Sequence, residues 1–177
     1  MNRRLLFAAL AAVAGGLVGA PAALADDAAV FNAYIARQAS EVNPAANAYA
    51  RAARRARRTG TARAYRAVIR ADQRINAVLG VIEGELLAQG PSSDPGSRAR
   101  TAAVREVRGW ARGNRYEIRG VRALIHGRRA RAGAWLARAD RTMRRTYRYG
   151  RRAVARFREV GLTSPVGAIS AKTRAEM

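Results

Sequence analysis

The sequence contains no cysteine, which excludes disulfide bonds, metal sites built from thiolates, and acylation at a cysteine. Histidine and lysine are almost as scarce, since His126 and Lys172 are the single examples of each. One histidine cannot supply a pair of histidine ligands within one chain. Aromatic residues make up 6% of the 177 residues and hydrophobic residues 49%, many of them alanine, so we expect one modest domain.

Acidic residues are heavily outnumbered. There are 12 Asp and Glu against 34 Lys and Arg, and the formal net charge is +22. A GC-rich genome favours arginine over lysine, but it does not explain the excess of positive charge. A field of this sign attracts polyanions whatever its origin, so we expect a negatively charged partner.

Sequence motifs of catalysis are also missing. The chain has no Gly-x-Ser-x-Gly elbow, no P-loop and no dinucleotide-binding glycine fingerprint. No glutamate is followed three residues later by histidine, the pair that di-iron bundles use. Glu83 and Glu85 would face nearly opposite sides of a helix, so we interpret them as ion-pair partners of arginines. The sequence predicts a protein that is not an enzyme and has no cofactor and no metal.

Residues 1–25 have the pattern of a signal peptide. A basic segment at residues 2–4 precedes an apolar run over residues 5–20, and Ala-Leu-Ala at residues 23–25 is a cleavage site. The run is short for an uncleaved membrane anchor, which is the alternative. We expect cleavage after Ala25, a secreted or extracytoplasmic protein of the cell envelope, and no transmembrane segment after cleavage.

The export route stays open between two systems. Residues 3–7, Arg-Arg-Leu-Leu-Phe, resemble a twin-arginine signal, and the mildly apolar run suits that route. The very short basic segment, and the lack of a basic residue before the cleavage site, favour general secretion.

The mature chain shows helical periodicity in four segments. Apolar and small residues recur at steps of three and four over residues 31–56, 65–86, 104–125 and 132–160. We therefore predict an all-α, up-down-up-down four-helix bundle over residues 26–161. The rival architecture is a pair of long helical hairpins that open or dimerise.

Particular residues predict where these helices bend and end. The first helix is kinked or broken at Asn43-Pro44, with Asn43 as a cap if it breaks. Gly60 ends the first segment, and Thr61 caps the next helix. Gly127 ends the third segment.

Two further stretches lack the helical pattern. Residues 89–96 are rich in Gly, Pro and Ser and form the one clear loop, after which Ser97 caps the third helix. Beyond Gly161 the periodicity dissolves, so residues 162–177 are expected to be a flexible tail.

Five polar residues fall at similar heights if the four segments run antiparallel. They are Asn47, Asp72, Asn114, Glu117 and Asp140. Such a layer inside a bundle is either a ligand or metal site, or a device that fixes the register of the helices with carboxylates paired to arginines. The structural role is favoured.

Aromatic residues and glycines leave two more alternatives. Five aromatic side chains lie among arginines and either pack at the edge of the core, which is favoured, or form a stacking platform for bases or sugars. They are Trp110, Tyr116, Trp135, Tyr147 and Tyr149. Two Gly-x-x-x-Gly pairs, at residues 80–84 and 109–113, allow close approach of helices, although this spacing is common by chance.

The distribution of charge is the most informative feature. No acidic residue occurs between Glu41 and Asp72, or between Glu117 and Asp140. These two windows contain the two hairpin turns, which an up-down-up-down bundle places at one end. The arginines expected to bind anions there are Arg51, Arg54, Arg55, Arg57, Arg58, Arg63, Arg66, Arg119, Arg122, Arg128, Arg129 and Arg131.

The sequence therefore predicts an exported bundle that binds anionic polymers or surfaces of the cell envelope. Non-specific binding of nucleic acid is possible within this class of ligand. The alternative is a structural or chaperone-like envelope protein that binds other proteins through an apolar groove. A cationic helix that disrupts membranes is a third hypothesis. The oligomeric state is not predicted.

Overall fold

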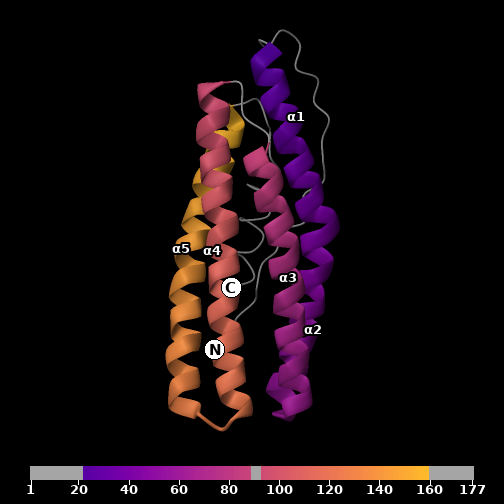
Figure 1. Ribbon diagram of the computed structural model, residues 1–177, viewed down its shortest axis with the longest axis vertical. Coiled ribbons are helices and arrows are strands. Elements are labelled where there is room, and N and C mark those ends of the chain that lie inside the picture. The colour runs from indigo at the N-terminus through magenta and orange to yellow at the C-terminus, as the bar shows by residue number, and fades with distance from the viewer. Residues whose placement is uncertain (1–21, 89–92, 160–177) are drawn as a thin grey trace, which may run out of the picture.

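Helices make up all of the secondary structure in the part of the chain that the structure describes, residues 22–88 and 93–159. In this computed structural model the elements are α1 (Ala22–Arg37), the π-helical turn η1 (Gln38–Val42), α2 (Asn43–Thr59), α3 (Ala62–Ala88), α4 (Asp94–Ile125) and α5 (Arg129–Glu159) (Figure 1). The predicted all-α class is confirmed. Most of the predicted signal peptide and the whole of the predicted tail lie outside these residues.

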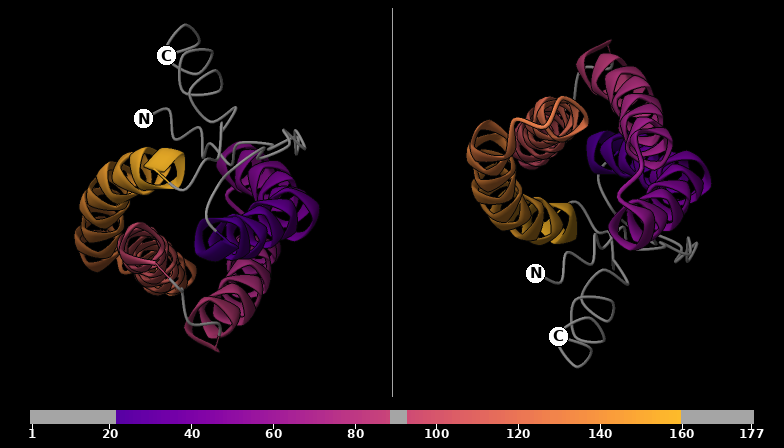
Figure 2. Two further views of the ribbon diagram at one scale, coloured as in Figure 1. Left: turned by 90° about the horizontal axis from the view of Figure 1, so that it is seen from above. Right: turned by 90° about the horizontal axis from the view of Figure 1, so that it is seen from below.

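The helices form a bundle of two layers (Figure 2). One layer contains α1, η1, α2 and α3, and the other contains α4 and α5. Along the chain, α2 packs on α3, α3 on α4 and α4 on α5, while α1 also contacts α3 and α4. Each long helix therefore lies beside its neighbour in sequence, and helices α2–α3 and α4–α5 form two hairpins (Figure 1).

The predicted apolar stripes form the core. Phe31, Ile75, Ile82 and Val107 are the largest fully buried apolar side chains. The stripe of α5 contributes mainly small residues, such as Ala132, which is also fully buried. Because alanine buries little apolar area, the stability of this side of the bundle depends on how closely the helix backbones approach.

The first helix continues through Asn43-Pro44 by means of η1. Proline has no N–H and its ring crowds the carbonyl four residues earlier, here Ser40, which lies inside the π-helical turn. A π turn shifts the hydrogen-bond register, so the chain accommodates Pro44 at the start of α2. Of the two alternatives, a break with Asn43 as a cap is wrong, because the residue before α2 is Val42, in helical conformation and without a side-chain cap.

Both hairpin turns contain a glycine in the left-handed region, at the two helix ends that the sequence predicted. Gly60 has φ 63° and donates its N–H to the Ala56 carbonyl at 2.9 Å. Gly127 has φ 69° and donates to the Leu124 carbonyl at 3.0 Å. This backbone conformation is costly for residues with a Cβ. Thr61 also caps α3 as predicted, since its Oγ1 accepts the Ala64 N–H at 3.3 Å.

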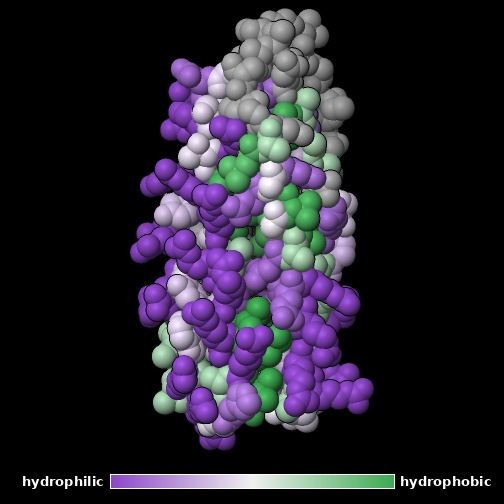
Figure 3. Space-filling model, in the orientation of Figure 1, coloured by the Kyte–Doolittle hydropathy of each residue, from purple (hydrophilic) through white to green (hydrophobic). Residues whose placement is uncertain are grey.

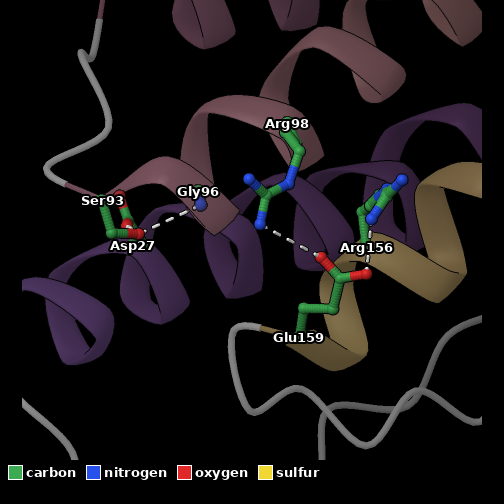
Figure 4. Close-up of polar contacts among 6 residues, drawn as sticks. All are labelled: Asp27, Ser93, Gly96, Arg98, Arg156 and Glu159. Carbon is green, nitrogen blue, oxygen red and sulfur yellow. Dashed lines mark hydrogen bonds and ion pairs between the residues drawn. The ribbon is translucent and has the colours of Figure 1, made fainter.

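The start of α4 differs from the prediction. The cap is Ser93 and not Ser97, because Ser93 Oγ accepts the Gly96 N–H at 3.0 Å (Figure 4). Pro95 is compatible with the first helical turn, where no N–H is required, so the helix begins inside the expected loop. The Ser93 hydroxyl in turn donates to the buried carboxylate of Asp27, which ties α1 to this end of α4.

Glycines bring α4 and α5 into close contact. Four glycines of this interface each face a side chain of the other helix that an added Cβ would strike. The pairs are Gly109 with Thr146, Gly113 with Met143, Gly120 with Leu136, and Gly150 with Glu106. A Cβ on Gly80 or Gly84 would meet only open space. Of the two predicted Gly-x-x-x-Gly pairs, one therefore serves close packing and the other does not.

None of the helices within residues 22–88 and 93–159 combines the length and the hydropathy that a membrane span requires.

Candidate anion-binding surface

The two hairpin turns lie at the same end of the bundle (Figure 1). The turn between α2 and α3 and the turn between α4 and α5 therefore bring the arginines of both acid-free windows to one end. We call the twelve arginines expected to bind anions the arginine cap. All twelve have exposed side chains.

The cap residues of α2 are exposed because the opposite side of the helix is buried. Ala56 is buried against the core, and Ala52 packs partly against it. The arginines at positions 51, 54, 55 and 58 then lie three or four residues apart on the solvent side. Like charges at this spacing each cost a few tenths of a kcal/mol, because they repel. An anionic ligand would remove that cost.

Three carboxylates that are half-buried or exposed form ion pairs with arginines outside the cap. Three such pairs have short N···O distances. They are Arg108 with Glu83 at 2.6 Å, Arg156 with Glu159 at 2.6 Å, and Arg144 with Asp140 at 3.0 Å. Glu159 also lies 3.8 Å from Arg98, at the end of the bundle opposite the turns (Figures 1 and 4).

Hydrophilic side chains also cover much of the molecular surface (Figure 3). In this view they project along both long edges, while an apolar strip runs lengthwise between them. Exposed arginines also occur outside the cap, as at Arg141, Arg145 and Arg148 on α5, so the cap is distinguished by its lack of acidic residues in sequence.

The predicted polar layer is only partly assembled. Asp72, Asn114 and Glu117 are 0%, 1% and 5% exposed. Asn47 is exposed, and Asp140 is half-buried and paired with Arg144, so neither joins a buried layer. The prediction of one layer of five residues is wrong, because the rotation of α2 and α5 about their own axes turns Asn47 and Asp140 wholly or partly toward solvent.

Tyr49 and Asn76, which were not predicted to belong to the polar layer, form hydrogen bonds with two of its buried residues. Tyr49 donates its hydroxyl to Glu117 Oε1, and Asn114 Nδ2 donates to Asn76 Oδ1 at 3.1 Å. These bonds join α2 to α4 and α3 to α4. Among the described residues, no cluster of three or more His, Cys, Asp or Glu could hold a metal ion. The contacts agree with a role in fixing helix register.

Two stacked aromatic rings of α4 and α5 lie beside two arginines, and we call these four residues the ladder. The rings of Tyr116 and Trp135 stack with centroids 5.7 Å apart and planes 22° apart. Arg119 lies over Trp135 at 5.0 Å, and Arg138 lies over Tyr116 at 4.8 Å. Of these contacts the sequence predicted only that the aromatic residues lie at the edge of the core, where both rings are half-buried.

A second feature that the sequence did not reveal lies where α1 meets α4. Burial raises the pKa of Glu106 to about 7, although a hydrogen bond from Trp110 Nε1, 3.4 Å from Glu106 Oε1, lowers it. Burial also raises the pKa of Tyr34, and the nearby Glu106 charge raises it further. No local signal predicts these shifts, because they arise from packing between distant segments.

The fold and the surface together define an all-helical bundle with an arginine-rich end. Comparison with protein-family models, curated proteins and solved structures finds no match to this chain.

Proposed function

We propose that this is an exported, non-enzymatic protein whose arginine cap binds anionic polymers or surfaces of the cell envelope. The mechanism is release of counterions from the polymer as guanidinium groups neutralise its charges, with little sequence or sugar specificity. Guanidinium suits this role because its planar fork pairs with phosphate or carboxylate oxygens.

One observation carries the proposal: both acid-free turns bring exposed arginines to the same end of the bundle. Helix surfaces usually mix charges of both signs, which stabilises the helix slightly. Here the repulsion between neighbouring arginines is retained in the free protein. A bound polyanion would offset it and gain attraction at several positions at once.

The test is a binding titration of the protein against single-stranded DNA, a phosphate-bearing wall polymer and vesicles rich in phosphatidylglycerol. If six to ten charges are neutralised, affinity falls by about 10³-fold or more between about 50 and about 200 mM salt. Full affinity retained in molar salt would overturn the proposal.

A charge-reversed variant locates the binding surface. Replacing Arg54, Arg55 and Arg58 with Glu removes cap charge from α2. The matched control replaces Arg141, Arg145 and Arg148 with Glu, which changes net charge equally on exposed positions of α5. We expect the cap variant to lose more affinity than the control. Equal losses would show that total charge matters and the cap does not.

The alternative is a structural or chaperone-like protein that binds other proteins. The apolar strip visible in Figure 3 favours it, because such strips are used to bind apolar partner segments. Cross-linking that captures defined protein partners, and that neither polyanions nor the cap substitutions affect, would favour this function over the first.

A further inference from the structure

We propose that the ladder formed by Arg119, Trp135, Tyr116 and Arg138 is a binding site for a phosphodiester-linked polymer, with one guanidinium for each of two neighbouring phosphates. This inference rests on the proposed function and specifies where one segment of the polymer is held. Only Arg119 belongs to the arginine cap.

The ladder stands on the interface of α4 and α5, where glycines let the two helices pack closely. Tyr116 and Arg119 are one helical turn apart on α4, and Trp135 and Arg138 are one turn apart on α5. Beside them Gly120 faces Leu136 so closely that a Cβ would collide with that side chain. A tightly packed pair of helices holds the four groups in a fixed geometry, which lowers the entropy lost when a ligand binds.

Stacking leaves the hydrogen-bond donors of both guanidinium groups available. A guanidinium contacts a ring through its flat face, whereas its N–H groups lie in its own plane and point outward. Both arginine side chains are exposed, and within the described residues neither forms an ion pair with a carboxylate. The rings therefore orient two cations without consuming the donors that an oxyanion needs.

The two cations lie near a single ring, as the binding of two neighbouring phosphates requires. Both guanidinium carbons lie close to the same Trp135 ring, at 5.0 and 5.8 Å from its centroid, so one short segment of polymer can reach both. The half-buried rings lie beside both cations, with Arg138 close to Tyr116 as well as to Trp135. A chain of phosphate, sugar or polyol linker, and phosphate would place its anions on the guanidinium groups and its linker against the ring edges.

The test changes the chemistry of the cations without changing their charge. Arg119→Lys with Arg138→Lys keeps the net charge but loses the planar forks and weakens ring stacking. The matched control is Arg141→Lys with Arg148→Lys, at exposed positions elsewhere on α5. Affinity for labelled single-stranded oligothymidylate is measured at low salt, with unlabelled polygalacturonate of equal total charge as competitor.

We expect the ladder variant to bind oligothymidylate about tenfold more weakly and the control to bind as the wild type does. Polygalacturonate can occupy the arginine cap but has no phosphodiesters, so it should displace oligothymidylate less effectively from the wild type than from the ladder variant. Equal binding by the two variants, with wild-type binding intact, would overturn the ladder site alone, even if melting shows that the ladder variant is less stable. Equal competition by polygalacturonate would overturn the assignment to phosphodiesters. Absence of binding by the wild type would overturn both this site and the proposed function.

Tryptophan fluorescence is a second measurement, and it reports binding at the ladder itself. The chain has two tryptophans, so Trp110→Phe leaves Trp135 as the sole reporter. Binding of oligothymidylate should change Trp135 emission over the same concentration range as the affinity measurement. Binding with no change in that emission would contradict contact at the ladder.

Discussion

The two hairpins carry the same Gly-x-x-x-Gly spacing and use it differently. In the α4–α5 hairpin, Gly109 and Gly113 each lie against a side chain of the facing helix. In the α2–α3 hairpin, Gly80 and Gly84 face open space. Spacing places two glycines on one face of a helix, but the residues opposite determine whether that face approaches another backbone.

The difference extends to the carboxylates of each hairpin. Glu83 on α3 remains partly exposed and pairs with Arg108 at 2.6 Å. Glu106 on α4 lies over Gly150, where the absence of a side chain leaves room for its carboxyl group. Both side chains are half-buried, but Glu106 is enclosed against a glycine and its pKa is raised, whereas Glu83 is paired with an arginine.

The largest expected effect comes from replacing Glu106 with Gln. Folding raises the pKa of Glu106 from 4.5 to about 7, so between these pH values the folded state binds more protons than the unfolded state. The free energy of unfolding therefore falls as pH rises through this window, by about 3 kcal/mol for this group. Glu106→Gln should remove that fall and stabilise the protein relative to wild type above pH 7.

Urea unfolding at several pH values between 4 and 8 measures this effect. The relevant quantity is the difference in unfolding free energy between wild type and variant, because other groups titrate in both proteins. Tyr34 and Trp110 face the same carboxyl group and remain unchanged. A difference that does not vary with pH would show that Glu106 keeps an ordinary affinity for protons.

A second, smaller effect is expected from Gly109→Ala. The new Cβ would strike Thr146, which is β-branched and whose Oγ1 donates to the Thr142 carbonyl at 2.9 Å, so it cannot easily rotate away. The helices must then separate, which destabilises the fold by about 1–3 kcal/mol. Gly113→Ala should cost less, because Met143 is flexible and can move. Chemical unfolding that ranks the two variants in the opposite order would contradict this account of the interface.

Sequence reasoning predicted what depends on local spacing. The three- and four-residue steps identified Phe31, Ile75 and Val107 as core residues, and helix ends were expected at Gly60 and Gly127. The exposure of the arginine cap followed from the same periodicity, because positions beside a buried stripe must face solvent.

Features that depend on contacts between helices were not predictable in this way. The ladder requires knowing that Tyr116 meets Trp135 across the α4–α5 interface, and the pKa of Glu106 requires knowing that α1 covers it. The cap at Ser93 was missed for a local reason, since Pro95 was interpreted as part of a loop although it also suits a first helical turn.

The smallest expected effect has the opposite sign and completes the comparison of the hairpins. Gly80→Ala adds a Cβ that meets open space on an exposed part of α3. Alanine restricts the unfolded chain and favours helix, so the free energy of unfolding should rise by up to about 1 kcal/mol. Thermal unfolding of this variant and of Gly109→Ala in parallel checks the sign of the change in stability. The two variants are comparable because each places alanine at the first glycine of a Gly-x-x-x-Gly pair. If both variants were destabilised, the α3 glycines would also lie against a partner surface, and the two hairpins would not differ as described.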